Sequence, residues 1–273
     1  MSRKSLVLLG AMIVMALPLF LWSQETAPVK PRHGGKRMTV DTTVSDQSTA
    51  VMDRVIIELV AWRTRSAEQI LNSAKKKYAG TSAYETALGG LRFNQKELSE
   101  ALELLAGAAS LDATDPAVAY YQGVVLKGQK KHDAADDAWR MARDHAKAKT
   151  SADSKDARSQ YYLGAARVRL KDASGAQKAL KAAATQGFDP RMVNLQVGLT
   201  HILDKDWSAA KSALDAVIEA DDRFAPAYFY RGVVWSKLGH NDKMAQDLEE
   251  FLLLAPDSPD AEAANVLLSG YQG

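Results

Sequence analysis

The stretch APAYFYRGVVWSKLGHNDKMAQDLEEFLLLAPDS, residues 225–258, decides the fold because its spacing recurs upstream. Gly232 lies near the centre of its first half. Four more glycines precede it at intervals of 34, 41, 34 and 34 residues, namely Gly89, Gly123, Gly164 and Gly198. A fixed period of this length is typical of a protein built from stacked structural repeats.

Two further columns keep the same register. Twelve residues after the five glycines lie small or apolar residues, namely Ala101, Ala135, Ala176, Ala210 and Met244. Sixteen residues after them lie large apolar residues, namely Leu105, Trp139, Leu180, Leu214 and Leu248. A glycine on one helix and a small residue on the next let the two helices approach closely, while the large residue fills the remaining space. Each unit is therefore predicted to be a pair of antiparallel helices.

Proline positions give an independent test of this register. The five prolines beyond residue 47 all fall at unit boundaries, and a proline inside a helix costs ~3 kcal/mol. The sequence predicts an all-α fold, a right-handed α-solenoid of about five 34-residue repeats plus capping helices. We place the units at 82–115, 116–149, 157–190, 191–224 and 225–258.

The segments outside these units have separate predictions. The seven extra residues between the second and third units, in KTSADSKDA, are expected to form a loop insertion. Residues 48–81 are predicted to be a degenerate N-terminal helix pair, with helices near Thr49–Trp62 and after Ser66. Residues 259–273 are predicted to hold a short C-terminal capping helix that covers the core with Ala263, Val266 and Leu267.

The array resembles the tetratricopeptide repeat (TPR) family. The residues that carry the resemblance in the last unit are Tyr228, Gly232, Trp235, Gly239 and Pro256. The resemblance covers roughly residues 82–258, and it is specific for fold and weak for function. Lysines replace the family's turn glycine in the other units, at Lys96, Lys130, Lys171 and Lys205, and these replacements are expected to alter local helix angles.

The N-terminus carries an export signal. Arg3 and Lys4 precede an apolar run from Leu6 to Trp22. Residues 1–23 are either a signal peptide cleaved after Ser23 or an uncleaved signal anchor, since the run is shorter than a full span of ~20 residues. Residues 24–47 read as a flexible linker. Both alternatives predict an exported protein, periplasmic or anchored to the membrane and facing the periplasm, with membrane association through residues 1–22 in the second case.

Composition and motifs argue against chemistry. The chain has no cysteine, which excludes disulfides and thiolate catalysis. Six Lys/Arg and three Asp/Glu lie in residues 1–47, so the rest of the chain is nearly neutral and no nucleic-acid partner is expected. None of the five histidines belongs to an H-E-x-x-H pattern, and no phosphate-binding or nucleophile motif occurs. We therefore predict no catalytic residue, no metal site and no cofactor.

The resemblance to TPR proteins implies a groove lined by the first helix of each pair, in which partners bind as extended peptides or helices. Columns three residues before the repeat glycine, and one, four and five after it, give the candidate groove residues. These are Thr86, Phe93, Tyr120, Val124, Lys127, Tyr161, Arg169, Leu195, Leu199, Phe229, Val233 and Lys237. Aromatic, aliphatic and a few cationic side chains are the composition expected of a protein-binding patch.

These observations predict a non-enzymatic scaffold or adaptor in the cell envelope that holds a protein partner in the groove. Two alternatives stay open at this point. The same surface could join copies of the chain in a homo-oligomeric structural protein, or the partner could bind the convex side. An enzyme with an unrecognised site is a remote third alternative.

Overall fold

The structure is a computed structural model that describes residues 42–271 of the chain. The predicted signal segment, and the linker as far as residue 41, lie outside the described residues. Within the described range there are thirteen helices and no strand. The helices are α2 (Thr42–Val60), α3 (Thr64–Tyr78), α4 (Ser82–Asn94), α5 (Leu98–Leu111), α6 (Pro116–Gly128), α7 (His132–Ala152), α8 (Ala157–Arg169), α9 (Ala173–Thr185), α10 (Pro190–Leu203), α11 (Trp207–Ala220), α12 (Ala225–Leu238), α13 (Asn241–Leu254) and α14 (Ala261–Tyr271).

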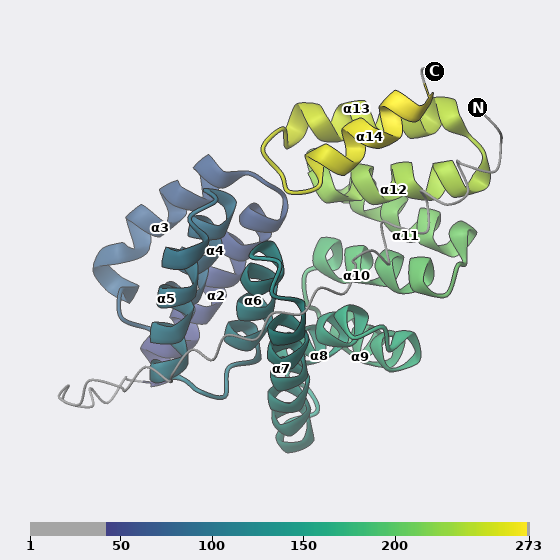
Figure 1. The fold of residues 1–273 in the computed structure, drawn as a ribbon. Helices are drawn as coiled ribbons and strands as arrows, with labels where there is room; N and C mark the ends of the chain where they lie inside the picture. Colours follow the sequence, from purple (N-terminus) through teal and green to yellow (C-terminus); the bar gives the residue numbers. More distant parts are fainter. Residues whose placement is uncertain (1–41, 272–273) are drawn as a thin grey trace. The chain divides into compact units, whose positions relative to one another are not determined.

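Consecutive helices pack in pairs, and the pairs stack on one another (Figure 1). The even-numbered helices α2 to α12 are the first helices of the pairs, and each packs against the first helix of the next pair. They form one continuous surface, which we call the first-helix face. The structure therefore has the predicted fold class, an all-α solenoid. No helix of residues 42–271 is long and apolar enough to span a membrane.

The interior of each pair shows why the glycine column exists. A Cβ added to Gly164 would lie 2.6 Å from Leu180 Cγ, and one added to Gly198 would lie 2.9 Å from Leu214 Cγ. Real side-chain carbons do not approach this closely, so the large residue of the second helix occupies the space that a side chain would need. Leu180 and Leu214 are fully buried as a result.

Helix starts and turns follow from local chemistry. Asp side chains cap several helices; the Asp115 carboxylate, for example, accepts a hydrogen bond of 2.9 Å from Ala117 N at the start of α6. Inside the pairs, each turn has one residue in the left-handed backbone region. These residues are Trp62, Lys96, Lys130, Lys171, Lys205 and Gly239, with φ between 60° and 80°. The lysines therefore keep the left-handed turn that Gly239 makes.

The N-terminal pair, α2 and α3, repeats the pattern of the others. Its left-handed turn residue, Trp62, lies 34 positions before Lys96, and its small and large positions Ala67 and Leu71 are buried. Helix α2 begins at Thr42, so the last six residues of the predicted linker are helical. Their polar composition hid this, but Val44 packs against the core.

Two expectations about other segments need correction. The predicted loop insertion in KTSADSKDA is helical in part, because α7 continues to Ala152 and only residues 153–156 lie outside a helix. In α14, Ala263 and Leu267 pack against the core of the last pair as predicted, but Val266 is 44% exposed and does not. Ala264 is fully buried, so the covering face includes it in place of Val266.

Candidate functional site

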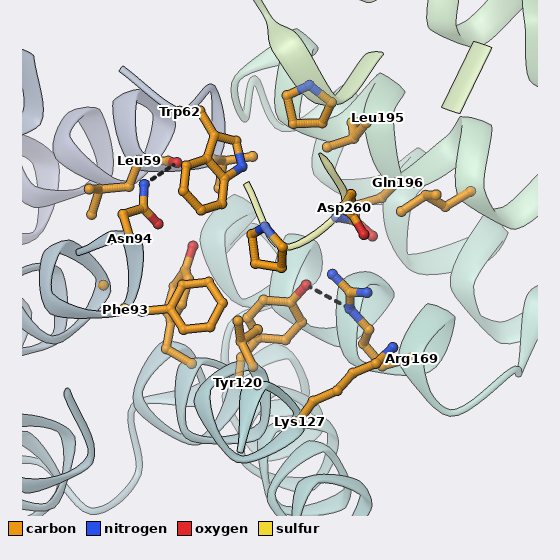
Figure 2. A pocket seen from close by; sticks show the side chains of 18 of the residues that line it. Leu59, Trp62, Phe93, Asn94, Tyr120, Lys127, Arg169, Leu195, Gln196 and Asp260 are labelled. Carbon is orange, nitrogen blue, oxygen red and sulfur yellow. Dashed lines mark hydrogen bonds between the residues drawn. The ribbon is translucent and has the colours of Figure 1, made fainter. Parts of the chain in front are cut away.

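A hollow of about 400 Å³ opens on the first-helix face. All six first helices, α2 to α12, contribute side chains to it, and so does the turn that precedes α14. We call it the central hollow. Figure 2 shows residues from these distant segments around one space, among them Trp62, Tyr120, Arg169 and Asp260. A cavity of this size lies at the small end of the range for ligand sites.

Eight of the twelve candidate groove residues line the central hollow. They are Phe93, Tyr120, Val124, Lys127, Tyr161, Arg169, Leu195 and Leu199. The columns four and five residues after the glycine therefore supply Lys127 and Arg169. The columns before and just after the glycine supply much of the apolar wall of the hollow.

The other four candidates lie away from the hollow. Thr86 is buried and donates a hydrogen bond of 2.7 Å to Ser82 O, within α4. Phe229 packs on Phe251 with ring centroids 5.1 Å apart, in the core of the last pair, and Val233 packs against the same core. Lys237 is exposed. Thr86, Phe229 and Val233 thus serve the packing of helices.

The hollow also contains residues that the sequence analysis did not single out. They are Leu59, Val60, Trp62, Asn94, Gln196, Pro226, Tyr230, Pro259 and Asp260, among others. Asn94 lies five residues after Gly89, in a column that the sequence analysis used. Leu59 and Val60 lie four and five residues after Val55, the glycine position of the N-terminal pair, so extending the columns would have found them. No pattern in the sequence indicates Pro259 or Asp260, because their place depends on how the last turn folds back.

Aromatic rings form the floor of the hollow. Tyr120 contacts Tyr162 with centroids 5.7 Å apart, and Tyr161 stacks on Phe188 at 4.4 Å. Behind this layer, Trp139 Nε1 donates a hydrogen bond of 3.2 Å to Tyr120 O. These rings are rigid and well packed, so the floor is preformed.

Lys127, Arg169 and Asp260 surround the open space, and the exposed Lys130 also lines it. Arg169 donates a hydrogen bond of 3.3 Å from Nε to Tyr120 Oη, which fixes the guanidinium beside the ring (Figure 2). Burial, together with the nearby Arg169, lowers the pKa of Lys127. Asp260 faces the hollow, and enclosure by protein raises the pKa of its carboxyl although Arg169 and Lys127 act in the opposite direction. Among the described residues, Lys127, Arg169 and Asp260 form no ion pair.

Ion pairs hold the first repeats to later ones beside the hollow. Arg63, in the turn after α2, donates from Nη1 to both carboxylate oxygens of Asp221 at 2.8 and 3.0 Å. Asp221, in turn, accepts from Arg191 at 3.0 Å. The neighbouring Trp62 packs against the core of the last pair. The two halves of the array therefore meet across the first-helix face.

A second charged cluster joins α2 to α8. Arg158 donates to Asp53 at 3.0 Å and to Asp115 at 2.8 Å. Burial raises the pKa of Asp53 although Arg158 opposes it, whereas for Asp115 the charge and hydrogen bonds of Arg158 outweigh burial and lower the pKa. The guanidinium also lies 5.1 Å from the centre of the Tyr162 ring. This cluster ties the wall of α2 to the aromatic floor.

The Arg63–Asp221 pair lies beside the hollow and joins turns from distant repeats. The open space admits side chains of a partner segment that lies on the first-helix face. Residues 42–271 contain no group of three side chains suited to a metal ion.

Comparison with known proteins bears on the fold. No family model matches the sequence, and no curated protein matches it. A solved thermophilic TPR protein from Thermus thermophilus superposes with a TM-score of 0.54 at 18% identity, over 70% of this chain and 99% of that one. The fold is TPR-like.

Two further TPR structures are similar over comparable lengths. One is YrrB, described as a TPR protein with an unusual peptide-binding site, with a TM-score of 0.39, 22% identity and coverage of 71% of this chain and 97% of that one. The other is a TPR protein from Parabacteroides merdae, with a TM-score of 0.42, 13% identity and coverage of 85% and 100%. At these identities the likeness concerns the fold alone.

Proposed function

We propose that this protein is a non-enzymatic interaction scaffold that holds a short extended segment of a partner protein against its first-helix face. One observation carries the proposal: all six first helices converge on a preformed hollow with an aromatic floor, and Lys127 and Arg169 in its lining have no ion-pair partner in residues 42–271. A surface of rigid aromatic side chains with an arginine is the type that dominates binding energy in protein interfaces.

The repeat architecture supports the same proposal. A solenoid exposes one continuous surface made from equivalent positions of successive repeats, which suits it to binding extended segments. The positions that line the hollow vary more from repeat to repeat than the packing positions do: Phe93 and Lys127, for example, share the column four residues after the glycine. Residue variation on a constant framework is how such folds acquire a particular partner.

The place of action is proposed from the N-terminal sequence. The basic start and the apolar run of residues 6–22 favour export, so the scaffold would work in the cell envelope, free in the periplasm or anchored. Fractionation of the native host, followed by N-terminal sequencing of the purified protein, tests this. Recovery of the full-length protein in the cytoplasmic fraction would contradict export.

The test of the scaffold function is affinity capture with matched variants. The native chain, Tyr120→Phe and Lys127→Gln are compared with Lys237→Gln, a lysine outside the hollow. We expect a partner to be enriched by the native chain and by Lys237→Gln, and to be lost with Lys127→Gln. Equal capture by all four proteins would show that the hollow is not the binding surface.

The alternative of a homo-oligomeric structural protein predicts a different outcome. In that case the native chain would self-associate in analytical ultracentrifugation, and Lys127→Gln would shift it toward monomer. A monomer at all concentrations leaves the interaction with a different protein as the function.

A further inference from the structure

The charged side chains around the central hollow leave an excess of positive charge, which one further anion would reduce. Lys127 comes from α6, Arg169 from α8 and Asp260 from the turn before α14, so they belong to three separate repeats. With one carboxylate against two cations, the three groups carry a net positive charge, and Lys130 adds a third cation to the lining. Lys127 and Asp260 are exposed and Arg169 is half-buried, so a bound group of negative charge can reach the cations and form charge-assisted hydrogen bonds with them.

The turn that carries Asp260 forms part of the wall of the central hollow. Ser258 is buried, and its Oγ accepts a hydrogen bond of 3.2 Å from Asp260 N. Pro259 and Asp260 both contribute to the wall of the hollow. Figure 2 shows the Asp260 side chain there. The chain thus places a proline followed by an acid beside the two cations, without bringing the carboxylate into an ion pair with either.

We propose that the central hollow accepts one acidic side chain from an extended segment of the partner, between Lys127 and Arg169, and that Asp260 holds this position in the free protein. This rests on the proposed scaffold function and names the chemistry of its partner. The acid of the partner displaces the Asp260 side chain, so Asp260 lowers the affinity for every acidic segment. The site recognises a carboxylate on a side chain, beside an apolar residue that packs on the aromatic floor.

Charge and wall chemistry select this occupant. Lys127 and Arg169 line the hollow and have no ion-pair partner in residues 42–271, so they suit a carboxylate. Its floor is aromatic, which suits a proline or an aliphatic side chain next to the acid. Gln196, only 3% exposed, lines the hollow, and its side-chain oxygen has no hydrogen-bond partner in the described part of the chain. It is available to a backbone N–H of the bound segment.

The protein supplies its own probe. The peptide PDSPDAE, the sequence of residues 256–262, is synthesised with an acetylated N-terminus and an amidated C-terminus, so that its only carboxylates are side chains. A second peptide carries asparagine at the position of Asp260 and keeps the other two acids. Binding to the full chain is measured by isothermal titration calorimetry for the native protein, Asp260→Asn, Asp260→Asn with Lys127→Gln, and Asp260→Asn with Lys237→Gln.

We expect the Asp260→Asn protein to bind PDSPDAE with a Kd below about 1 mM, and the native protein to bind it roughly tenfold more weakly, because a like charge remains in the site. Adding Lys127→Gln lowers the affinity roughly tenfold or more, whereas adding Lys237→Gln leaves it unchanged. Lys237 is the matched control, since it occupies the column of Arg169 in another repeat and lies outside the hollow. The asparagine peptide binds weakly to every variant.

Several results would overturn the inference. Equal affinity of the acidic and asparagine peptides would show that no carboxylate is recognised, and equal affinity of native and Asp260→Asn proteins would show that Asp260 does not compete. If acetate at the concentration of the peptide displaces it fully, the site takes a free small acid and not a segment. Should all peptides fail while a captured partner still depends on Lys127, the scaffold function stands and only the acidic chemistry of the partner is wrong.

Discussion

The interiors of the helix pairs and the first-helix face follow opposite rules. Inside the pairs, repeat after repeat uses a glycine opposite a large residue, as in Gly164 with Leu180 and Gly198 with Leu214. On the first-helix face, equivalent positions carry different side chains, and residues up to 158 positions apart form ion pairs. Contacts within one helix pair determine the packing of the interior. The contacts across the first-helix face depend on the angles between successive pairs.

This difference shows where a small sequence change has a local effect and where it acts at a distance. A change in a pair interior alters one unit and the stability of its neighbours, as expected for a one-dimensional array. A change in the contacts that cross the first-helix face alters the opening of the hollow without disturbing any pair. The predictions below test each side of this contrast.

The largest effect is expected for Gly123→Ala. The added Cβ would lie 2.6 Å from Trp139 Cδ1, and the indole is held by its hydrogen bond to Tyr120 O, so it has no easy way to move. We expect the free energy of unfolding to fall by about 3 kcal/mol, measured by urea denaturation. Gly107→Ala is the control, because nothing lies within 4 Å of a Cβ there; it should raise stability by about 0.5–1 kcal/mol. Equal losses for the two variants would contradict the packing role of the glycine column.

A smaller effect on stability, but a larger one on the hollow, is expected for Arg63→Met. The methionine keeps an apolar stem but leaves Asp221 without its bidentate partner. Because the pair is partly exposed, the loss should be about 1–2 kcal/mol. Arg92→Met is the matched control, since Arg92 pairs with Glu100 inside one helix pair. Hydrogen exchange of α2 and α12 should increase in the first variant only; an identical pattern in both would argue against a contact across the face.

Two aspartates should respond to pH with opposite signs. Burial alone would raise the pKa of Asp221, but Arg63 and Arg191 outweigh it and hold the pKa below the ordinary value of 3.8. Its contribution to stability is therefore complete above pH 3.8 and is lost as the pH falls through the lower, folded-state pKa. Enclosure raises the pKa of Asp260, so its ionised form opposes folding above that raised pKa.

The measurement is the free energy of unfolding from pH 3 to pH 7 for Asp221→Asn and Asp260→Asn. At neutral pH the first should be less stable than the native chain by about 1 kcal/mol, and the second should be more stable by less than that, because Asp260 is exposed and solvent screens its charge. As the pH falls, both differences should shrink: for Asp260→Asn between its raised pKa and 3.8, and for Asp221→Asn below 3.8. If both variants changed the free energy of unfolding in the same direction, the placement of Asp221 in the contact with Arg63 and of Asp260 beside the hollow would be contradicted.

The smallest effect concerns the left-handed turns. Lys171 has φ of 62°, a conformation that costs an L-residue about 1–2 kcal/mol. Lys171→Gly removes that cost but adds about 0.5–1 kcal/mol of chain entropy, so a net gain of about 0.5 kcal/mol is expected by thermal denaturation. Gly239→Lys makes the reverse change at the equivalent turn, where φ is 80°. It should lose a similar amount; a gain would mean that the two turns are not equivalent.

The contrast between interior and face also explains what the sequence could predict. The glycine, small and large columns repeat with a fixed period, so they indicate the helix pairs without any knowledge of the whole. Eight candidate groove residues line the hollow because the columns also record which side of each first helix faces inward. Phe229 was assigned to the groove from the same column as Tyr120, but in the last pair that column packs against Phe251, since no further repeat follows to leave it free.

The remaining features depend on superhelical geometry that no local pattern encodes. The contact of Arg63 with Asp221 requires the angles between five pairs to sum to a particular value. The placement of Asp260 requires in addition that the turn before α14 fold back toward α6 and α8. The helical course of residues 149–152 was missed for a simpler reason, because a polar surface helix and a polar loop have the same composition.

The central claim is that the contact of Arg63 with Asp221 joins the first repeats to the later ones beside the hollow. The chain has no cysteine, so spin labels can be attached to Arg65→Cys and Arg223→Cys, two exposed positions next to that contact, without removing a native thiol. Double electron–electron resonance then measures the distance between them. We predict one narrow distance distribution, which broadens and moves to longer distances when Arg63→Met is added. A broad distribution that Arg63→Met leaves unchanged would contradict the claim.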